Sequence, residues 1–547
     1  MNQEKSSVLG RLVEITHDYF VAKLKPDLDG VTTDKMIGMD KVRIGQVGSY
    51  LMVNQSDTKI LCTVEKMWTE ESTRTHDIFH LQLIPLGEFD SNGDFTRGLN
   101  HYPTVGAELQ LVSNWNLERI FSDFSDVFYK VGKLSAFETI DVYLDASAFF
   151  GRHAAILGQT GSGKSWTVTS LIQSALRYMP NAHIIMMDMH GEYGDKKTDS
   201  FASSPFPASK VRCMDAMDLE LPYWLLTYSD LAEIFINEDD IYASVQYAFL
   251  RTALGELRIE ANKGSDLGRI TVDSPVYFSL DELVEKFEEA NSETSDFGRK
   301  RGPMYGHFDQ LLVRMQSMMN DSRYAFMMKP QMRTSTDSLV DLLKDFVGLG
   351  DPRANVTVLN LSSVPFDVAP SVTGLIGRLA FEFNFWNPKC LEFPIWLVCE
   401  EAQMYIPRDD HSRFKESRRA MEHISKAGRK YGVGLCVVSQ RPAEVSETVL
   451  AQCGTFICLR IANPDDQEYL RSMVPDAARG TFATITSLAR GEVVAMGAAV
   501  PMPVRFKMNL PNPPPNAQDV DYAGKWSKGG EEIDVKQLVS NWHRQVR

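Results

Sequence analysis

The sequence predicts an α/β protein in which a three-layer core of strands and helices follows a small β-barrel and is interrupted by a helical insertion. Short alternating apolar and polar runs extend from Val8 to about Ser122, and nearly continuous apolar runs alternate with helical segments after Arg152. From about Val211 to Asp345, between two of these apolar runs, the apolar residues recur at the spacing of a helix. The expected units are 1–125 (barrel, for assembly or docking), 126–210 and 346–510 (the two parts of the core), 211–345 (helical insertion) and 511–547 (linker and tail).

The barrel is expected because many short strands at close spacing, separated by turn residues, are typical of small closed sheets. The turns include "DLDG" and "DSNGD". The strand candidates are "GRLVEITHDYFVAKLKP", "VGSYLMVNQ", "TKILCTVEKMW" and "THDIFHLQLIPLG". No catalytic constellation stands out among them, so an assembly or docking role is expected.

The core strands are expected to be parallel, because strands covered by helices on both faces are nearly continuously apolar. Alternation with helical segments favours the same arrangement. The candidates are "HAAILG", "HIIMMDM", "VTVLNL", "IWLVCEE", "VGLCVVSQ", "TFICLRI" and "EVVAMG", which begin at His153, His183, Val356, Ile395, Val433, Thr455 and Glu492.

The insertion is expected between the second and third core strands, with no strands from about Val211 to Asp345. Its loop "DFGRKRG", residues 296–302, carries three adjacent basic residues that are either solvated or in contact with DNA. The C-terminal segment begins as a proline-rich linker and ends in an amphipathic stretch, which must pack on its own core or across a subunit boundary. The apolar residues of that stretch are Val535, Leu538, Val539 and Trp542.

Composition excludes several classes of protein. There is no apolar run long enough to span a membrane and no apolar signal-peptide region, so a cytoplasmic protein without a membrane segment is expected. Seven scattered cysteines without a CxxC pair are typical of reduced thiols. A net charge of −15 gives no support for general coating of nucleic acid, so any DNA contact must use a local basic surface.

One segment has the residues of a phosphate-binding loop. "GQTGSGKS" matches G-x-x-x-x-G-K-[ST] in full and lies between an apolar strand and a helical run. Glycines let backbone N–H groups approach phosphates, the lysine neutralises the β- and γ-phosphates, and the serine hydroxyl binds Mg²⁺. The sequence therefore predicts ATP and Mg²⁺ as ligands, bound by Gly158, Gln159, Thr160, Gly161, Ser162, Gly163, Lys164, Ser165 and Trp166.

Two adjacent carboxylates follow another apolar strand, in "IWLVCEEAQ". Sites in open α/β sheets lie at the carboxyl ends of strands, and paired carboxylates there require a compensating cation. Glu400 is the candidate on the Mg²⁺ side, together with Ser165. Glu401 is the candidate that orients and deprotonates the attacking water.

Three further segments carry candidate residues. "MMDMHGEYG" brings Asp188 and Glu192 to the end of the second strand, either beside the γ-phosphate or as a polar turn. Gln440 ends a later strand, where it can sense the γ-phosphate by hydrogen bonding. The segment from Arg408 to Lys430 holds eight Lys and Arg against four Asp and Glu, which is the local basic enrichment that DNA contact requires.

Together these motifs resemble the HerA family of hexameric P-loop ATPases with a RecA-like core, within the HerA–FtsK group. The resemblance rests on "RHAAILGQTGSGKS", "DMHGEY", "VCEEAQ", "GRKYGVGLCVVSQRP" and "ANPDDQEYLRSMVP" and covers nearly the whole chain. The sequence departs from the common "DPHGEY" at Met189 and from "EEAH" at Gln403. Neither change removes a group needed for phosphate chemistry.

The resemblance implies a homohexamer that moves double-stranded DNA through its centre. It also implies arginine fingers that act on the neighbouring subunit's nucleotide, with Arg429 as the first candidate and Arg152 as the second. Relatives work with a NurA-type nuclease in end processing, or with nuclease or sirtuin-like effectors in antiphage defence. Because no nuclease carboxylate cluster or NAD-binding fingerprint is visible, an effector is expected to be a separate protein.

Three functions remain open at this point. The first is an ATP-hydrolysing DNA translocase or helicase. The second is a nucleotide-dependent ring scaffold that assembles and activates an effector with little translocation. The third is a secretion or conjugation ATPase, against which the lack of a membrane segment counts. A transporter of the ABC type is not supported, because the chain has no LSGGQ-like signature.

Overall fold

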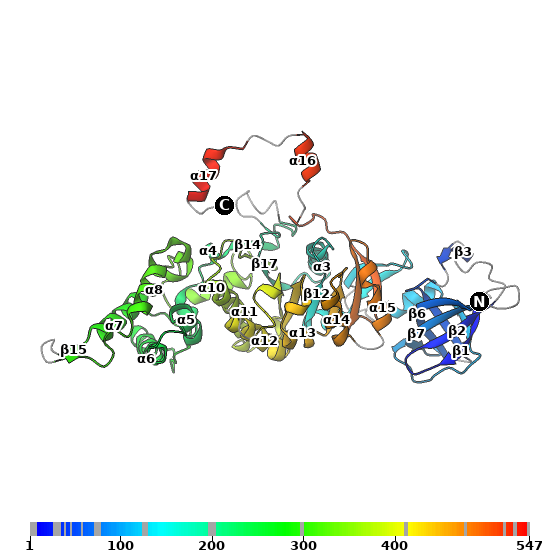
Figure 1. Ribbon diagram of the computed structural model, residues 1–547, viewed down its shortest axis with the longest axis horizontal. Helices are drawn as coiled ribbons and strands as arrows, with labels where there is room; N and C mark the ends of the chain where they lie inside the picture. Colours follow the sequence, from blue (N-terminus) through cyan, green and yellow to red (C-terminus); the bar gives the residue numbers. More distant parts are fainter. Residues whose placement is uncertain are drawn as a thin grey trace.

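The computed structural model contains a barrel, an α/β core and a helical arm arranged in a row, with the barrel and the arm at opposite ends of the core (Figure 1). The structure describes residues 8–25, 34–37, 40–43, 46–55, 58–70, 78–122, 129–194, 204–295, 300–409, 414–474, 478–517, 521–528 and 533–543. This arrangement confirms the predicted fold class.

The N-terminal sheet closes on itself. Its strands lie in the order β2 (Phe20–Leu24), β1 (Gly10–Ile15), β9 (Glu108–Leu111), β5 (Tyr50–Gln55), β6 (Thr58–Glu70) and β7 (Ile78–Phe89), and β7 pairs back onto β2. Alternate residues such as Leu12, Ala22, Val53 and Leu83 fill the interior. β8 (Phe95–Arg97) pairs with β7 and adds a further strand beside it. Strands β3 (Asp34–Ile37) and β4 (Asp40–Arg43) form a separate hairpin. Helix α1 (Asn114–Ser122) follows the barrel.

In the part of the chain that the structure describes, the core sheet has seven parallel strands that lie next to one another. Their order is β20 (Thr455–Cys458), β12 (Ala154–Leu157), β19 (Val433–Ser439), β18 (Ile395–Cys399), β13 (His183–Asp188), β17 (Val356–Asn360) and β14 (Val211–Asp215). Beyond β20 the sheet continues with antiparallel strands β21 (Glu492–Gly497), β22 (Val504–Met508), β10 (Tyr129–Leu134) and β11 (Asp141–Leu144).

Two expectations about these strands are wrong. Strands do not stop at Val211, because β14 occupies the edge of the sheet beside β17; an edge strand is covered less completely, so its apolar run is short. The segment from Glu492 is not a parallel strand, because β21 runs antiparallel to β20. A continuous apolar run records burial on both faces and does not record strand direction.

Helices cover both faces of the sheet. Ile184 and Met186 of β13 pack in one apolar cluster with α3 (Lys164–Tyr178), whereas Ile185 and Met187 face the opposite cluster. The opposite cluster also contains α11 (Ala369–Phe385) and α12 (Lys415–Ala427). Successive residues of one buried strand therefore belong to different layers, which is the arrangement of a three-layer core.

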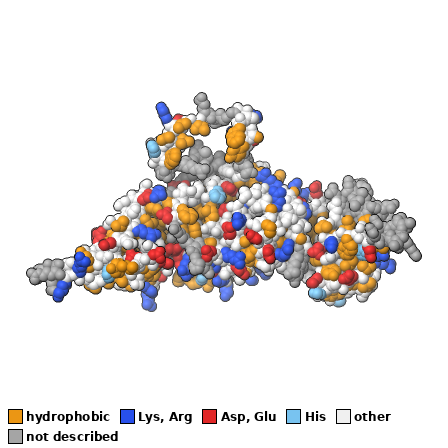
Figure 2. All heavy atoms as spheres, viewed as in Figure 1, with side chains coloured by type: hydrophobic (Ala, Val, Ile, Leu, Met, Phe, Trp, Pro, Cys, Tyr) orange, Lys and Arg blue, Asp and Glu red, His pale blue; other side chains and the backbone are white. Residues whose placement is uncertain are grey.

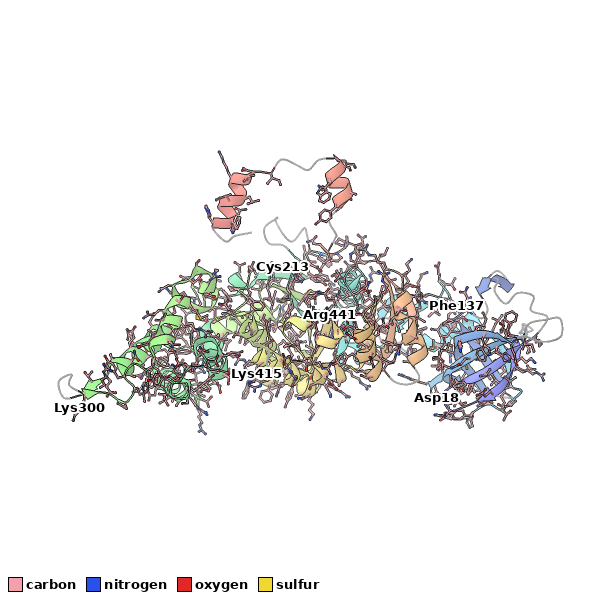
Figure 3. The ribbon with its side chains drawn as sticks, viewed as in Figure 1. Asp18, Phe137, Cys213, Lys300, Lys415 and Arg441 are labelled. Carbon is pink, nitrogen blue, oxygen red and sulfur yellow. The ribbon has the colours of Figure 1, made fainter. Side chains whose placement is uncertain are left out.

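The helical insertion follows β14 and ends before β17. It comprises α4 (Ala216–Leu219), α5 (Tyr228–Phe235), α6 (Ala243–Ala261), α7 (Leu280–Ser292), α8 (Asp309–Asn320), α9 (Ala325–Met328) and α10 (Ser338–Phe346). A short hairpin of β15 (Thr294–Ser295) and β16 (Lys300–Arg301) lies at its tip, where Figure 3 labels Lys300. Part of the predicted basic loop, residues 296–299, lies outside the described residues, and the exposed Arg301 covers the Tyr305 ring at 4.7 Å.

The C-terminal tail stands off the core as α16 (Tyr522–Lys528) and α17 (Val535–His543) (Figure 1). No residue of either helix is buried, and apolar side chains on both helices face solvent (Figure 2). The exposed fractions of Val535 and Leu538 are 62% and 47%. Of the two alternatives for this tail, packing on its own core is not seen among the described residues, and packing across a subunit boundary stays a prediction. No helix within the described ranges is long and apolar enough to cross a membrane.

Candidate nucleotide site

The phosphate-binding loop connects the carboxyl end of β12 to the first residue of α3, Lys164. Gly161 and Gly163 have left-handed backbone angles, with φ of 75° and 105°, which glycine adopts without steric cost. A Cβ atom on Gly158 would lie 2.7 Å from Cβ of Leu459, so the loop also needs glycine where it packs on the exit of β20. The residue types at these positions follow from the loop geometry.

Lys164 is buried, and carboxylates converge on it. Its Nζ donates to the carbonyl oxygen of Gln159 at 3.4 Å. Burial lowers the pKa of Lys164, and the negative charges of Glu401, Glu400 and Glu192 oppose that shift. These carboxylates come from two different strand ends, so the fold assembles the site from distant segments.

Glu400 is enclosed at the end of β18, with 5% of its surface exposed. The Tyr193 hydroxyl donates to its Oε1. Burial raises the pKa of Glu400 to about 8, and the charges of Glu192, Asp188 and Glu401 add to the rise. Such a carboxyl gives up its proton readily only when a cation compensates its charge.

The residues present fit a magnesium ion in one respect that does not depend on the motif. Oε2 of Glu192 is buried and has no hydrogen-bond partner among the described residues. Mg²⁺ is usually held by one or two carboxylates, by water and by substrate phosphates. A carboxylate oxygen without a donor, close enough to Glu400 for the two charges to interact, suits that chemistry. Within the described residues, no group of three or more His, Cys, Asp and Glu side chains is arranged to hold a metal ion by itself.

Asp188 has a different environment from the one expected beside a γ-phosphate. Its Oδ1 accepts from the backbone N–H groups of His190, Gly191 and Glu192, at 3.3, 2.8 and 3.1 Å, and its Oδ2 accepts from Tyr193 at 3.0 Å. The side chain is 1% exposed. These contacts favour the alternative in which Asp188 shapes a polar turn, and that turn presents Glu192.

Glu401 is held by two amide side chains. It has a left-handed φ of 48° and is 8% exposed. Its Oε2 accepts from Nε2 of Gln440 at 2.9 Å and from Nε2 of Gln403. Oε1 of Gln440 accepts from the Thr160 hydroxyl in the phosphate-binding loop, so Gln440 connects that loop to Glu401. Arg441, labelled in Figure 3, follows Gln440 just after the end of β19.

The "ANPDDQ" segment binds the phosphate-binding loop from the other side. The Ala462 N–H donates to Oε1 of Gln159 at 2.9 Å, and the Gln159 N–H donates to the carbonyl oxygen of Arg460 at 3.0 Å. Asp466 of α14 (Pro464–Met473) accepts from the Ala443 N–H at 3.0 Å, just beyond Gln440. One segment therefore supports both the loop and the strand end that holds Gln440.

A cavity of about 240 Å³ opens beside the start of α3. Nε1 of Trp166 is buried there without a hydrogen-bond partner among the described residues. The lining residues are Gly163, Trp166, Thr167, Arg490, Gly491, Met508, Asn509, Leu510 and Pro511. Sequence reasoning found Trp166 and missed Arg490 and Leu510, because they lie more than 300 residues away in the chain and belong to no motif.

Comparison with known families agrees with this geometry. The family model described as "Helicase HerA, central domain" matches residues 129–380, and the model described as "Helicase HerA-like C-terminal" matches residues 409–516. The chain belongs to the HerA family. It is accordingly a P-loop ATPase, as the phosphate-binding loop predicts.

HerA relatives cover most of this chain at modest identity. "DNA double-strand break repair helicase HerA" of Sulfolobus acidocaldarius is 26% identical and the match covers 80% of each chain. "Probable helicase MJ1565" of Methanocaldococcus jannaschii is 24% identical, over 88% of this chain and 90% of its own. Among solved structures, VirB4 of Thermoanaerobacter pseudethanolicus is 16% identical, covers 70% of this chain and 96% of its own, and has a TM-score of 0.48.

The two arginine-finger candidates of the HerA resemblance lie away from this chain's own phosphate-binding loop. Arg152 precedes β12, and Arg429 precedes β19, so both are at the amino ends of parallel strands whose carboxyl ends carry the site. Both are exposed. The seven residues of β19 separate Arg429 from Gln440 by about 20 Å at the usual rise per residue.

The charge of the segment from Arg408 to Lys430 predicts a local surface for DNA contact. Residues 410–413 of this segment lie outside the described residues, and residues 415–430 form α12 and the turn after it. Figure 3 labels Lys415 at its start. Several of its cations pair with acids of the same helix: Glu422 accepts from Arg418 at 2.8 Å and lies 3.6 Å from Lys426, and Glu416 pairs with Arg419. Lys430, like Arg429, is exposed beyond the end of the helix.

Proposed function

We propose that this protein is an ATP-driven double-stranded DNA translocase or helicase that works in the cytoplasm as a homohexamer, with a separate nuclease or sirtuin-like effector, in antiphage defence or DNA end processing. The observation that carries the proposal is an incomplete site. Lys164, Glu401 and Gln440 meet at the carboxyl ends of the parallel strands, whereas Arg429 lies at their amino ends. In a ring of copies, the surface of one subunit that carries Arg429 would lie against the nucleotide of the next.

The chain's own residues supply the proposed chemistry. Backbone N–H groups of 158–165 and the Lys164 ammonium hold the β- and γ-phosphates. The attacking water gives a proton to Glu401, and its oxygen bonds to the γ-phosphorus as the bond to the β–γ bridging oxygen breaks and ADP leaves with the electron pair. Mg²⁺, held on the protein side by Ser165 and Glu400, would neutralise phosphate charge. Arg429 of a neighbour stabilises the transition state.

The cavity beside α3 is the proposed place for the nucleotide base and ribose. It adjoins Gly163 at the start of the helix that receives the phosphates. Trp166 offers an aromatic face, Leu510 an exposed apolar side chain, and Arg490 a cation, which are groups suited to a stacked base.

The test is ATP turnover of the assembled protein with and without linear duplex DNA. Strong stimulation by DNA supports a translocase. Lys164→Ala should lose nucleotide binding, because the phosphates lose their cation, whereas Glu401→Gln should bind ATP and lose turnover. A Glu401→Gln protein that still hydrolyses ATP at the wild-type rate contradicts the role of Glu401.

The ion pairs on α12 favour a second candidate, the nucleotide-dependent ring scaffold that assembles an effector. Cations already neutralised by Glu416 and Glu422 contribute less to phosphate binding. Substantial ATP turnover that is indifferent to DNA, and that changes when an effector is added, would support the scaffold over the translocase.

A further inference from the structure

Gln403 is placed to control the geometry of Glu401. It belongs to the short helical turn Ala402–Met404 directly after Glu401 and is partly buried. Its Nε2 donates to Oε2 of Glu401, and its Oε1 accepts the Ser439 hydroxyl at 2.7 Å. Ser439 is fully buried at the end of β19, and its oxygen accepts the Arg441 N–H at 3.0 Å.

These contacts fix which way the amide of Gln403 points. A carboxylate can only accept hydrogen bonds, so the NH₂ group of Gln403 must face Glu401. The carbonyl oxygen of Gln403 then faces Ser439, whose hydroxyl donates to it. The anchor of this contact is the sheet itself, because Ser439 is a residue of β19 paired in register with Leu157 of β12.

Gln440 contacts the same oxygen of Glu401 and has a different anchor. Its own carbonyl oxygen is held by Thr160, in the loop that receives phosphates. Its position therefore depends on what that loop binds, whereas the position of Gln403 does not. Among the described residues no group donates to Oε1 of Glu401, so that oxygen remains as the acceptor for a proton from water.

We propose that Gln403 is a positioning residue that fixes the Glu401 carboxylate through Oε2 and leaves Oε1 as the base. The inference rests on the proposed hydrolysis at this site and extends it to a residue that does not touch substrate. If Gln403 is replaced by a side chain of similar size that has no N–H donor, the packing is kept and the Glu401 carboxylate loses its fixed orientation. A histidine, the residue that the HerA resemblance shows at this position, restores an N–H donor.

The experiment compares Gln403→Met, Gln403→His and a matched control, Gln316→Ala, on the exposed face of α8. Each assembled protein is assayed for kcat, for KM and for ATP affinity in the absence of turnover. Gln403→Met should lower kcat by roughly 10-fold to 100-fold, the size expected when a charged acceptor loses one donor, with KM and affinity within about twofold. Gln403→His should recover most of the lost kcat, and the control should match the wild type.

Several outcomes overturn the inference. They are a Gln403→Met protein with wild-type kcat, a loss of affinity in proportion to kcat, and a histidine variant no better than the methionine variant. If Gln403→Met does not fold, as judged by its thermal midpoint, Ser439→Ala provides the second test. It frees the amide to rotate and should lower kcat in the same selective way; an unchanged kcat overturns the inference.

A Glu401→Gln arm separates this inference from the proposed function. If Glu401→Gln still turns over ATP, the proposed role of Glu401 fails, and the role of Gln403 fails with it. If Glu401→Gln is inactive and Gln403→Met is normal, only the positioning role of Gln403 is wrong.

Discussion

His153 shows how one residue at the start of a strand acquires an unusual environment. It has a left-handed φ of 54° and is 4% exposed. Its Nδ1 accepts the Leu435 N–H at 2.9 Å, which joins the entry of β12 to β19. Burial lowers the pKa of His153 to about 4, and the charge of Arg429 contributes to the shift. The folded protein therefore keeps this imidazole neutral.

We predict that His153 makes the core sensitive to acid. Its pKa is about 4 in the folded state against 6.5 in the unfolded chain, so its stabilising contribution is complete above pH 6.5 and is lost as the pH falls toward 4. The full loss is about 3 kcal/mol at 1.36 kcal/mol per pH unit. His153→Asn keeps an acceptor, tolerates a left-handed backbone and does not titrate.

The measurement for His153 is the thermal midpoint of wild type and His153→Asn at pH 7 and pH 5. The decrease on acidification should be smaller in the variant. Equal decreases in the two proteins would show that other groups account for the acid sensitivity.

At the scale of elements, the Glu220 carboxylate helps to hold the two ends of the helical insertion together. Glu220 follows α4 with a left-handed φ of 45° and is 7% exposed. It accepts the backbone N–H groups of Gln331, Met332 and Arg333 at 2.8, 2.8 and 3.1 Å. The buried Trp224 indole donates to the carbonyl oxygen of Arg333 at 2.9 Å, beside the same junction.

We predict that Glu220→Gln weakens this junction. The amide can accept at its one oxygen and directs N–H groups toward backbone donors, so the stability of the insertion should fall by about 1–3 kcal/mol. Hydrogen exchange of residues 325–345 should rise. The matched control is Glu256→Gln, whose exposed ion pair with Lys286 should contribute about 1 kcal/mol or less. Equal effects of the two substitutions would contradict the role of Glu220.

Particular elements show what the sequence can predict and where prediction fails. The runs at His183, Ile395 and Val433 predict β13, β18 and β19, because a strand covered on both faces has no polar positions. β14 was missed because a sheet edge needs no continuous apolar run. The short strand β9, which helps close the barrel, was also missed, since its four residues carry too little pattern.

The candidate site was predictable where local motifs define it. Spacing and strand context predict the site residues in Gly158–Ser165 and Glu400–Glu401. The structure brings both segments to the carboxyl ends of the parallel strands. Motifs do not reveal which partners satisfy a side chain. The four backbone donors around Asp188 and the contact of Gln403 with Ser439 depend on how loops fold over one another.

For the whole molecule, the position of Arg429 predicts complementation between subunits. Arg429→Ala alone should lose roughly 10³-fold in kcat, the usual contribution of an arginine finger, while assembly and ATP binding persist. Lys164→Ala alone should bind no nucleotide. Mixed rings should regain activity, because a Lys164→Ala subunit supplies its Arg429 to a neighbour with an intact phosphate-binding loop. Turnover of the mixture no higher than the sum of the separate proteins would contradict action in trans.

The strand order of the core has a consequence for how the protein is made. β12 and β13 are not neighbours, because β18 and β19 lie between them, and the contact of His153 with Leu435 spans 282 residues. A ribosome adds that length in roughly 15 to 55 seconds. During that time the first core strands emerge without their sheet partners and expose unpaired apolar edges. We expect the nascent chain to depend on chaperones until the strands from β17 to β20 have been synthesised.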